Sequence, residues 1–109
     1  MVLFYIYIKM NIDFNKLSTS YDERQKFYQT KEWKYLREYI LGNNPLCVEC
    51  KKNGNLVLAT ECDHKIDIQV SPELCLESDN VQSLCKSCHS KKTNKRKSNE
   101  TVLNRIWRV

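Results

Sequence analysis

The sequence predicts a small α+β domain, and three observations carry this prediction. The first is an apolar stripe at helical spacing, formed by Trp33, Leu36 and Ile40. The second is a pair of short β-favouring segments, 56–64 and 81–84, with a polar connection between them. The third is a pair of CxxC motifs that flank these segments. The expected order is therefore helix, CxxC, strand, connection, strand, CxxC and helix.

The chain length sets the domain organisation. With 109 residues, the chain is long enough for one small domain with extensions and too short for two. Domains of this size bury a modest share of their surface, and many need a covalent or metal cross-link. We expect an N-terminal extension at 1–26, the domain at 27–98 and a C-terminal tail at 99–109.

The N-terminus begins with a run of seven apolar residues at 2–8. The run has no basic residues before it and no small-residue cleavage site, and it is too short to span a bilayer. We interpret it as a strand or as sequence upstream of a true start at Met10, and the sequence does not decide between Met1 and Met10. We expect a cytoplasmic, reducing environment and no membrane partner.

The first helix is predicted after a polar segment at 11–28, which shows little periodicity and is expected to be an irregular arm. Thr30 is an acceptable N-cap, and Glu32 places a negative charge in the first turn. Gly42 is the expected C-terminal stop, and Pro45 prevents continuation.

The second helix is predicted to start near Cys85 and to run into a basic stretch. If segment 101–109 is also helical, four apolar residues fall on one side, and we favour docking of that side on the core over docking on a second copy. These residues are Val102, Leu103, Ile106 and Trp107. On the first helix, Arg37 lies near the polar edge and is interpreted as a solvated side chain rather than a phosphate contact.

Charge is unevenly distributed along the chain. Residues 1–84 contain ten Lys and Arg against twelve Asp and Glu, whereas residues 85–109 contain eight against one. This asymmetry indicates a polyanionic partner at the C-terminal end.

Four of the six cysteines form the two CxxC motifs, Cys47/Cys50 and Cys85/Cys88, with 34 residues between the pairs. Each motif supplies two thiolates from one tight turn, and Zn²⁺ prefers four such ligands in a tetrahedron. Two redox dithiols are the alternative, but the chain shows no βαβ pattern of a thioredoxin-like domain. We expect one structural zinc site that cross-links the domain.

Two further cysteines, Cys62 and Cys75, stand outside these motifs. Each occupies a position where an apolar residue would serve, and free cysteine is among the most buried residue types. We assign both to packing.

Asp63, His64, Asn80 and His89 are the candidate catalytic residues. Hydrolysis of a phosphodiester requires a base that deprotonates water and a positive charge near the phosphate. An imidazole can act as that base near neutral pH. Asp63 and His89 could hold a divalent cation if the strand end and the second helix face each other.

These residues resemble a known family. The order of Asp63-His64, then Asn80 and His89, interleaved with the two CxxC motifs, is similar to the HNH endonucleases. Small phage-type members encoded beside terminase genes and McrA-like restriction enzymes are the most similar branches. The resemblance covers about residues 27–95, including ECDHK and NVQSLCKSCH. It implies a ββα-metal (His-Me finger) domain, preceded by a helix, that cleaves DNA with a divalent metal ion.

By position, the resemblance makes His64 the general base and makes Asp63 and His89 the ligands of Mg²⁺ or another divalent cation. Asn80 would restrain the loop that carries the base. The zinc ligands would be Cys47, Cys50, Cys85 and Cys88. Relatives often follow the Asp-His pair with an apolar residue and a proline. This chain has Lys65 and Ile66 instead, so the loop lacks that proline and Lys65 adds a cation close to the expected phosphate.

The expected partner is DNA, and phage terminase or another genome-processing protein is a further expectation. The residues predicted to contact nucleic acid are Lys65, Lys91, Lys92, Lys95 and Arg96. Two alternatives stay open: an inactive zinc-stabilised nucleic-acid-binding module, and a protein-interaction zinc domain, which the basic C-terminal region disfavours. Target sequence, nicking against double-strand cleavage, metal preference, oligomeric state and phage or restriction role are not determined by the sequence.

Overall fold

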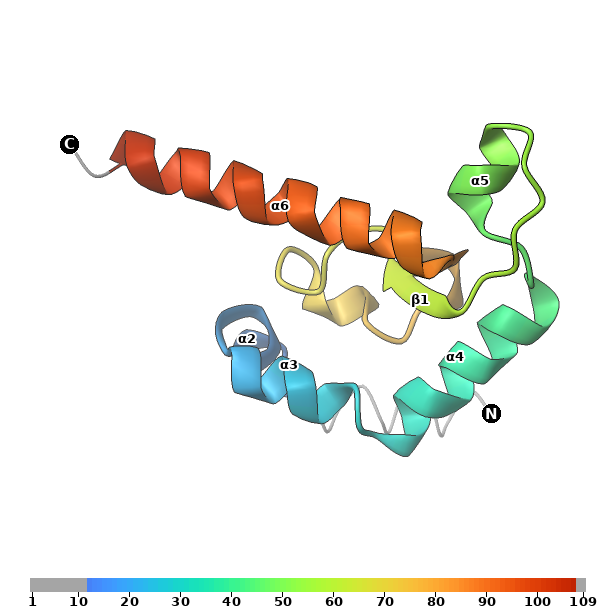
Figure 1. The fold of residues 1–109 in the computed structure, drawn as a ribbon. Coiled ribbons are helices and arrows are strands. Elements are labelled where there is room, and N and C mark those ends of the chain that lie inside the picture. The colour runs from blue at the N-terminus through green and yellow to red at the C-terminus, as the bar shows by residue number, and fades with distance from the viewer. Residues whose placement is uncertain (1–11, 108–109) are drawn as a thin grey trace.

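The computed structural model describes the backbone of residues 12–107 and the side chains of residues 12–98. Its centre is an antiparallel hairpin of two strands, β1 (Glu61–His64) and β2 (Val81–Leu84). The helix α6 (Lys86–Trp107) directly follows β2 and runs along the hairpin, while α4 (Lys31–Asn43) lies across from it (Figure 1). The predicted α+β class and the strand–strand–helix order are confirmed.

The segment expected to be an irregular arm is helical, so that prediction was wrong. It forms α2 (Phe14–Thr19) and α3 (Tyr21–Phe27), whose N-caps are the side chains of Asp13 and Ser20. Leu17 is the buried residue of α2. Helices of six and seven residues contain fewer than two turns, too few for an apolar stripe to be visible in the sequence.

Helix α4 begins as predicted, because the Thr30 hydroxyl accepts a hydrogen bond from the Trp33 amide at 3.2 Å. Its apolar stripe faces the core, with Trp33 5 % and Ile40 4 % exposed. The prediction that Gly42 stops the helix was wrong, since α4 continues to Asn43. The break falls at Asn44, whose backbone is not helical, directly before Pro45.

The first CxxC motif opens a short helix, α5 (Val48–Lys52). The apolar run that follows, Leu56 to Leu58, was expected to start the first strand. It is mostly exposed, and in it only Leu58 makes an isolated bridge, to Leu46. The strand proper begins at Glu61 because residues 61–64 pair with β2. High β-propensity does not form a strand where no partner strand is available.

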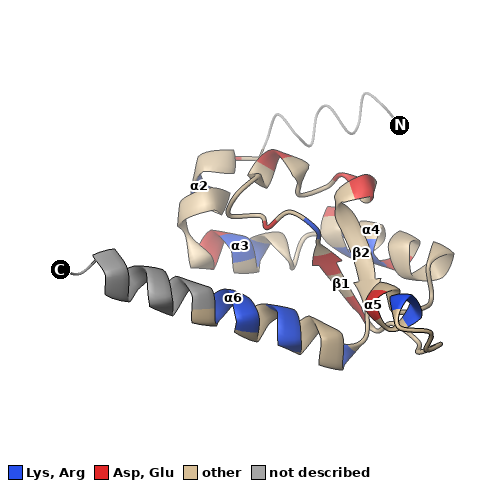
Figure 2. Ribbon diagram, turned by 90° about the horizontal axis from the view of Figure 1, so that it is seen from above, with Lys and Arg blue, Asp and Glu red and all other residues tan. Residues whose placement is uncertain are grey.

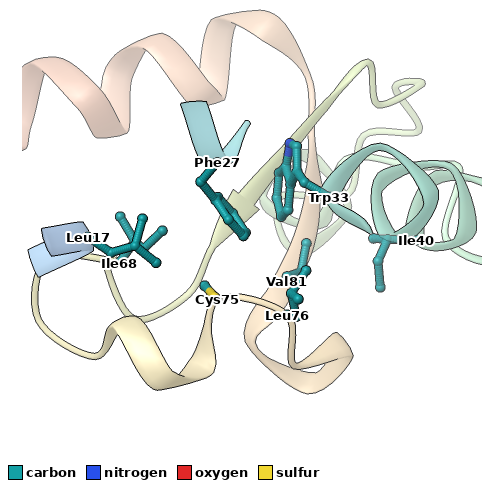
Figure 3. Packing of buried hydrophobic residues seen from close by; sticks show 8 residues of the cluster. All are labelled: Leu17, Phe27, Trp33, Ile40, Ile68, Cys75, Leu76 and Val81. Atoms are coloured by element: carbon teal, nitrogen blue, oxygen red, sulfur yellow. The ribbon is translucent and has the colours of Figure 1, made fainter. Parts of the chain in front are cut away.

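The core lies between the hairpin, the N-terminal helices and the β1–β2 connection (Figure 3). The connection contains two short 3-10 helices, η1 (Pro72–Leu74) and η2 (Ser78–Asn80). Cys75 is 1 % exposed and Cys62 packs partly buried against the same cluster. The assignment of both cysteines to packing is confirmed.

Helix α6 is one continuous helix, and its C-terminal part extends away from the hairpin (Figure 1). The predicted docking of the apolar side chains in segment 101–109 lies outside the described side chains. The apolar run at 2–8 also lies outside the described residues. Among the helices that the structure describes, none is long and apolar enough to cross a membrane.

Candidate active site and metal centre

Three of the candidate catalytic residues line one cavity of ≈ 380 Å³. Asp63 and His64 come from the C-terminal end of β1, and His89 comes from the first turn of α6. Trp33 and Arg37 of α4 also line the cavity. The hairpin, α6 and α4 therefore meet around the residues that the sequence singled out.

The His64 imidazole is buried, with 6 % of the residue exposed. Its ring stacks on Trp33 with centroids 4.9 Å apart and planes 23° from parallel. Its Nε2 lies 2.9 Å from the Cys75 carbonyl oxygen. A carbonyl only accepts, so Nε2 carries the proton and Nδ1 keeps its lone pair. Burial also lowers the pKa of His64 below its ordinary value, which favours the neutral, proton-accepting ring at pH 7.

Asp63 and His89 face each other across the cavity, with 3.9 Å between Asp63 Oδ1 and His89 Nε2. Two bonds of about 2.1 Å to one small divalent cation can span this separation. The other carboxylate oxygen, Oδ2, pairs with the Lys92 ammonium and accepts from the Gln82 amide at 3.3 Å. One oxygen is thus held by the protein, and the other is directed toward the imidazole.

Asn80 is buried and joins the two ends of the β1–β2 connection. Its Oδ1 accepts from the Ile66 amide at 2.9 Å, and its Nδ2 donates to the carbonyls of Ile66 and Leu74 at 3.2 and 3.4 Å. Its backbone carbonyl accepts from the Lys65 amide at 2.7 Å. The residues directly after His64 are therefore fixed to the start of β2.

The two CxxC motifs meet, and the sulfur atoms of Cys47, Cys50, Cys85 and Cys88 all lie within 4.8 Å of one another. The Cys50 sulfur is 3.8 Å from that of Cys85 and 3.7 Å from that of Cys88. A tetrahedron with metal–sulfur bonds of about 2.3 Å has edges of about 3.8 Å. This donor set and spacing fit a tetrahedral thiolate-bound metal.

The thiol of Cys47 has an environment suited to a thiolate. Burial opposes its ionisation, but hydrogen bonds from the backbone of Cys50 and Cys85 bring its pKa below the ordinary value. Thiolates are the metal-binding form of cysteine. Because Cys85 and Cys88 bracket the start of α6, this cluster also sets the direction in which His89 leaves that helix.

The five cations predicted to contact nucleic acid do not share one environment. Lys92 and Arg96 lie on α6 but pair with Asp63 and Asp67. Lys65 lines a different cavity of ≈ 540 Å³, together with Lys52. The remaining two, Lys91 and Lys95, are exposed on α6, where Figure 2 shows several blue bands of Lys and Arg.

Arg37 is the site residue that the sequence analysis missed. It was interpreted as solvated, yet its Nη2 donates to the Thr60 carbonyl at 2.7 Å and its side chain lines the cavity of Asp63 and His64. The available signal was its spacing: Arg37 follows Trp33 by one helical turn, which places both side chains on one face.

Comparison with known proteins identifies the family of this chain. The family model described as HNH endonuclease matches residues 47–95. A probable HNH endonuclease from Lactococcus phage SK1 is 35 % identical over 81 residues, covering 70 % of this chain and 84 % of the relative.

A solved structure is also similar. The crystal structure of the deep-sea thermophilic bacteriophage GVE2 HNH endonuclease with manganese ion superimposes with a TM-score of 0.68 at 31 % identity. The match covers 82 % of this chain and 98 % of that one. Fold, family model and sequence identity point the same way, and the chain belongs to the HNH endonuclease family.

Proposed function

We propose that this endonuclease hydrolyses DNA phosphodiester bonds with a divalent cation, using His64 as the general base. One observation carries the proposal: the buried His64 imidazole, with its Nε2 2.9 Å from the Cys75 carbonyl oxygen, shares a cavity with a facing carboxylate–imidazole pair. The family and the manganese in the similar phage structure support it.

In this proposal, His64 Nδ1 accepts a proton from the attacking water. That atom has no hydrogen-bond partner among the described residues, whereas Nε2 is anchored to Cys75. The Cys75 carbonyl stabilises the imidazolium that forms, because it accepts from Nε2–H in both protonation states. Stacking on Trp33 restricts rotation of the ring. These contacts hold the base in one orientation before substrate arrives.

Asp63 Oδ1 and His89 Nε2 would hold the catalytic cation, Mg²⁺ or another divalent ion. Such a cation supplies positive charge to the phosphate and the leaving oxygen. Lys92 contributes by fixing Asp63 Oδ2 and by donating to the His64 carbonyl at 2.9 Å. It thereby ties the ligand and the base to the same turn of α6.

The four clustered cysteines would hold a structural Zn²⁺. The sulfur spacing supports tetrahedral binding, and thiolates are ligands that Zn²⁺ favours. This metal would couple α5 to the start of α6, and so would support the position of His89.

Asn80 restrains the segment after the base, and its loss is expected to be costly. Asn80→Ala removes three hydrogen bonds and leaves the amide and the carbonyl of Ile66 without their partner, so we expect destabilisation on the order of 2–4 kcal/mol. Urea denaturation measures this effect, and faster hydrogen exchange at the Ile66 amide would report local opening. The matched control is Asn43→Ala, which removes one exposed amide contact; equal stability of the two variants would contradict the role of Asn80.

A plasmid assay tests the proposed function directly. Supercoiled DNA incubated with the protein and Mg²⁺, Mn²⁺ or Ni²⁺ is expected to be nicked or linearised, and EDTA is expected to stop the reaction. Protein that binds the plasmid without cutting it in any of these metals would instead support the inactive nucleic-acid-binding module.

A further inference from the structure

Arg37 reaches the catalytic strand from helix α4. It lies one turn after Trp33, and side chains four residues apart share a helix face. Trp33 stacks on the His64 ring, and Arg37 Nη2 donates to Thr60, the residue before β1. One face of α4 thus supplies the Trp33 ring that stacks on His64 and the Arg37 guanidinium that lines the same cavity.

The guanidinium of Arg37 keeps its charge available. Two arginines line the cavity, Arg37 and Arg96. Arg96 is engaged with Asp67 at 2.6 Å. Arg37 instead contacts a neutral carbonyl, and no carboxylate of the described residues forms an ion pair with it. Since a guanidinium has five N–H donors, one bond to Thr60 leaves most of them free.

The cavity continues past Arg37 along α4. A neighbouring cavity of ≈ 380 Å³ shares Tyr28, Trp33 and Arg37 with the catalytic one and adds Lys34 to its lining. Arg37 therefore lies where the two hollows meet. A polynucleotide extends on both sides of the bond that is cleaved. Two adjoining cavities that share Arg37, although Glu38 and Glu61 also line them, therefore suit this polymer better than a small phosphate ester.

We infer that Arg37 donates to a nonbridging oxygen of a phosphate in the cleaved strand. The fork of N–H groups in arginine matches the geometry of phosphate oxygens. The inference rests on the proposed function and names a substrate contact for it. The competing role is structural: the bond to Thr60 would then serve only to hold α4 against β1.

The test compares Arg37→Gln, which loses the charge but keeps an amide donor, with Arg37→Lys, which keeps the charge. Lys31→Gln is the matched control, because Lys31 is an exposed cation of the same helix that lines neither cavity. Affinity for a DNA duplex is measured over a range of salt without added divalent cation and without chelator, so that the cysteine-bound metal stays in place. Cleavage is measured as kcat and KM with Mn²⁺, and folding is checked by thermal unfolding.

For Arg37→Gln we expect kcat/KM to fall about 10- to 100-fold, as for loss of one charge-assisted hydrogen bond. The slope of log affinity against log salt should become shallower by about 0.9, the value of one phosphate contact. Arg37→Lys should keep the wild-type slope.

An Arg37→Gln protein with the slope and the kcat/KM of Lys31→Gln would overturn the inference and leave the proposed function intact. Lower thermal stability of both Arg37 variants with wild-type slopes would assign the residue to the structural role and also overturn it. Wild-type protein that cuts no DNA would contradict the proposed function itself, and the salt slopes would still decide the phosphate contact.

Discussion

Replacing His64 with alanine is expected to lower the rate of DNA cleavage by about 10²- to 10⁴-fold, the usual contribution of a general base. The variant keeps Asp63 and His89 and therefore keeps the residues proposed to hold the cation. Rates of plasmid nicking under single-turnover conditions, with Mn²⁺ in excess, measure the effect. Cleavage by His64→Ala at the wild-type rate would remove the imidazole from the chemistry.

The control for this variant must separate lost chemistry from lost structure, because His64 is buried and stacked on Trp33. Alanine leaves an imidazole-sized space between that ring and the Cys75 carbonyl. Added imidazole is expected to enter this space and restore part of the rate, while thermal unfolding reports any loss of stability. A folded variant that imidazole does not rescue, with reduced affinity for Mn²⁺, would indicate a role in the metal site instead.

Loss of the proposed zinc site is expected to have the largest effect on stability. Cys85→Ser removes one of four clustered sulfurs, and binding of structural zinc contributes on the order of 10–16 kcal/mol in zinc-finger peptides. Domains of ordinary stability have about 5–15 kcal/mol in total. We therefore expect the variant to lose its cooperative thermal transition. Metal analysis should find about one zinc per chain in the wild type and little in the variant.

Cys62→Ser is the matched control, because Cys62 lies outside the cluster and is only partly buried. It is expected to keep the zinc and a cooperative transition. Wild-type protein that stays folded with no bound metal after dialysis against a strong chelator would contradict the structural role of zinc. Equal zinc loss in both cysteine variants would contradict the assignment of ligands.

Parts of the cysteine cluster and of the candidate active site were predictable, because each short motif keeps its own residues close together. A CxxC turn brings two sulfurs together whatever the rest of the chain does. Asp63 and His64 are adjacent in the sequence, and His89 directly follows Cys88. The family resemblance added the order of these short motifs. The meeting of the two CxxC motifs was expected, and the structure shows it.

Other features depended on contacts between distant residues. Helices α2 and α3 are too short to leave a periodic signal, and they are fixed by their caps and by burial of Leu17 and Phe27. Leu56 to Leu58 has the composition of a strand, but these residues lie outside the paired segments. Composition measures preference, whereas a strand requires a partner.

The charged residues also show what the sequence reveals and what depends on contacts between distant residues. The sequence shows that α6 is basic, but not which of its cations are already paired. Lys92 is tied to Asp63 and Arg96 to Asp67, each 29 positions away in the chain, while Arg37 reaches the cavity from α4.

By itself, the sequence determined the chemistry of this protein, since the identities and short spacings of the thiols, imidazoles and carboxylate are covalent properties of the chain. The tertiary structure decided which nitrogen of His64 carries the proton and which oxygen of Asp63 faces His89. It also decided which arginine lines the cavity without an ion pair to a described carboxylate. Each of these depends on a partner supplied by a different element, at distances of a few ångströms that only packing can set.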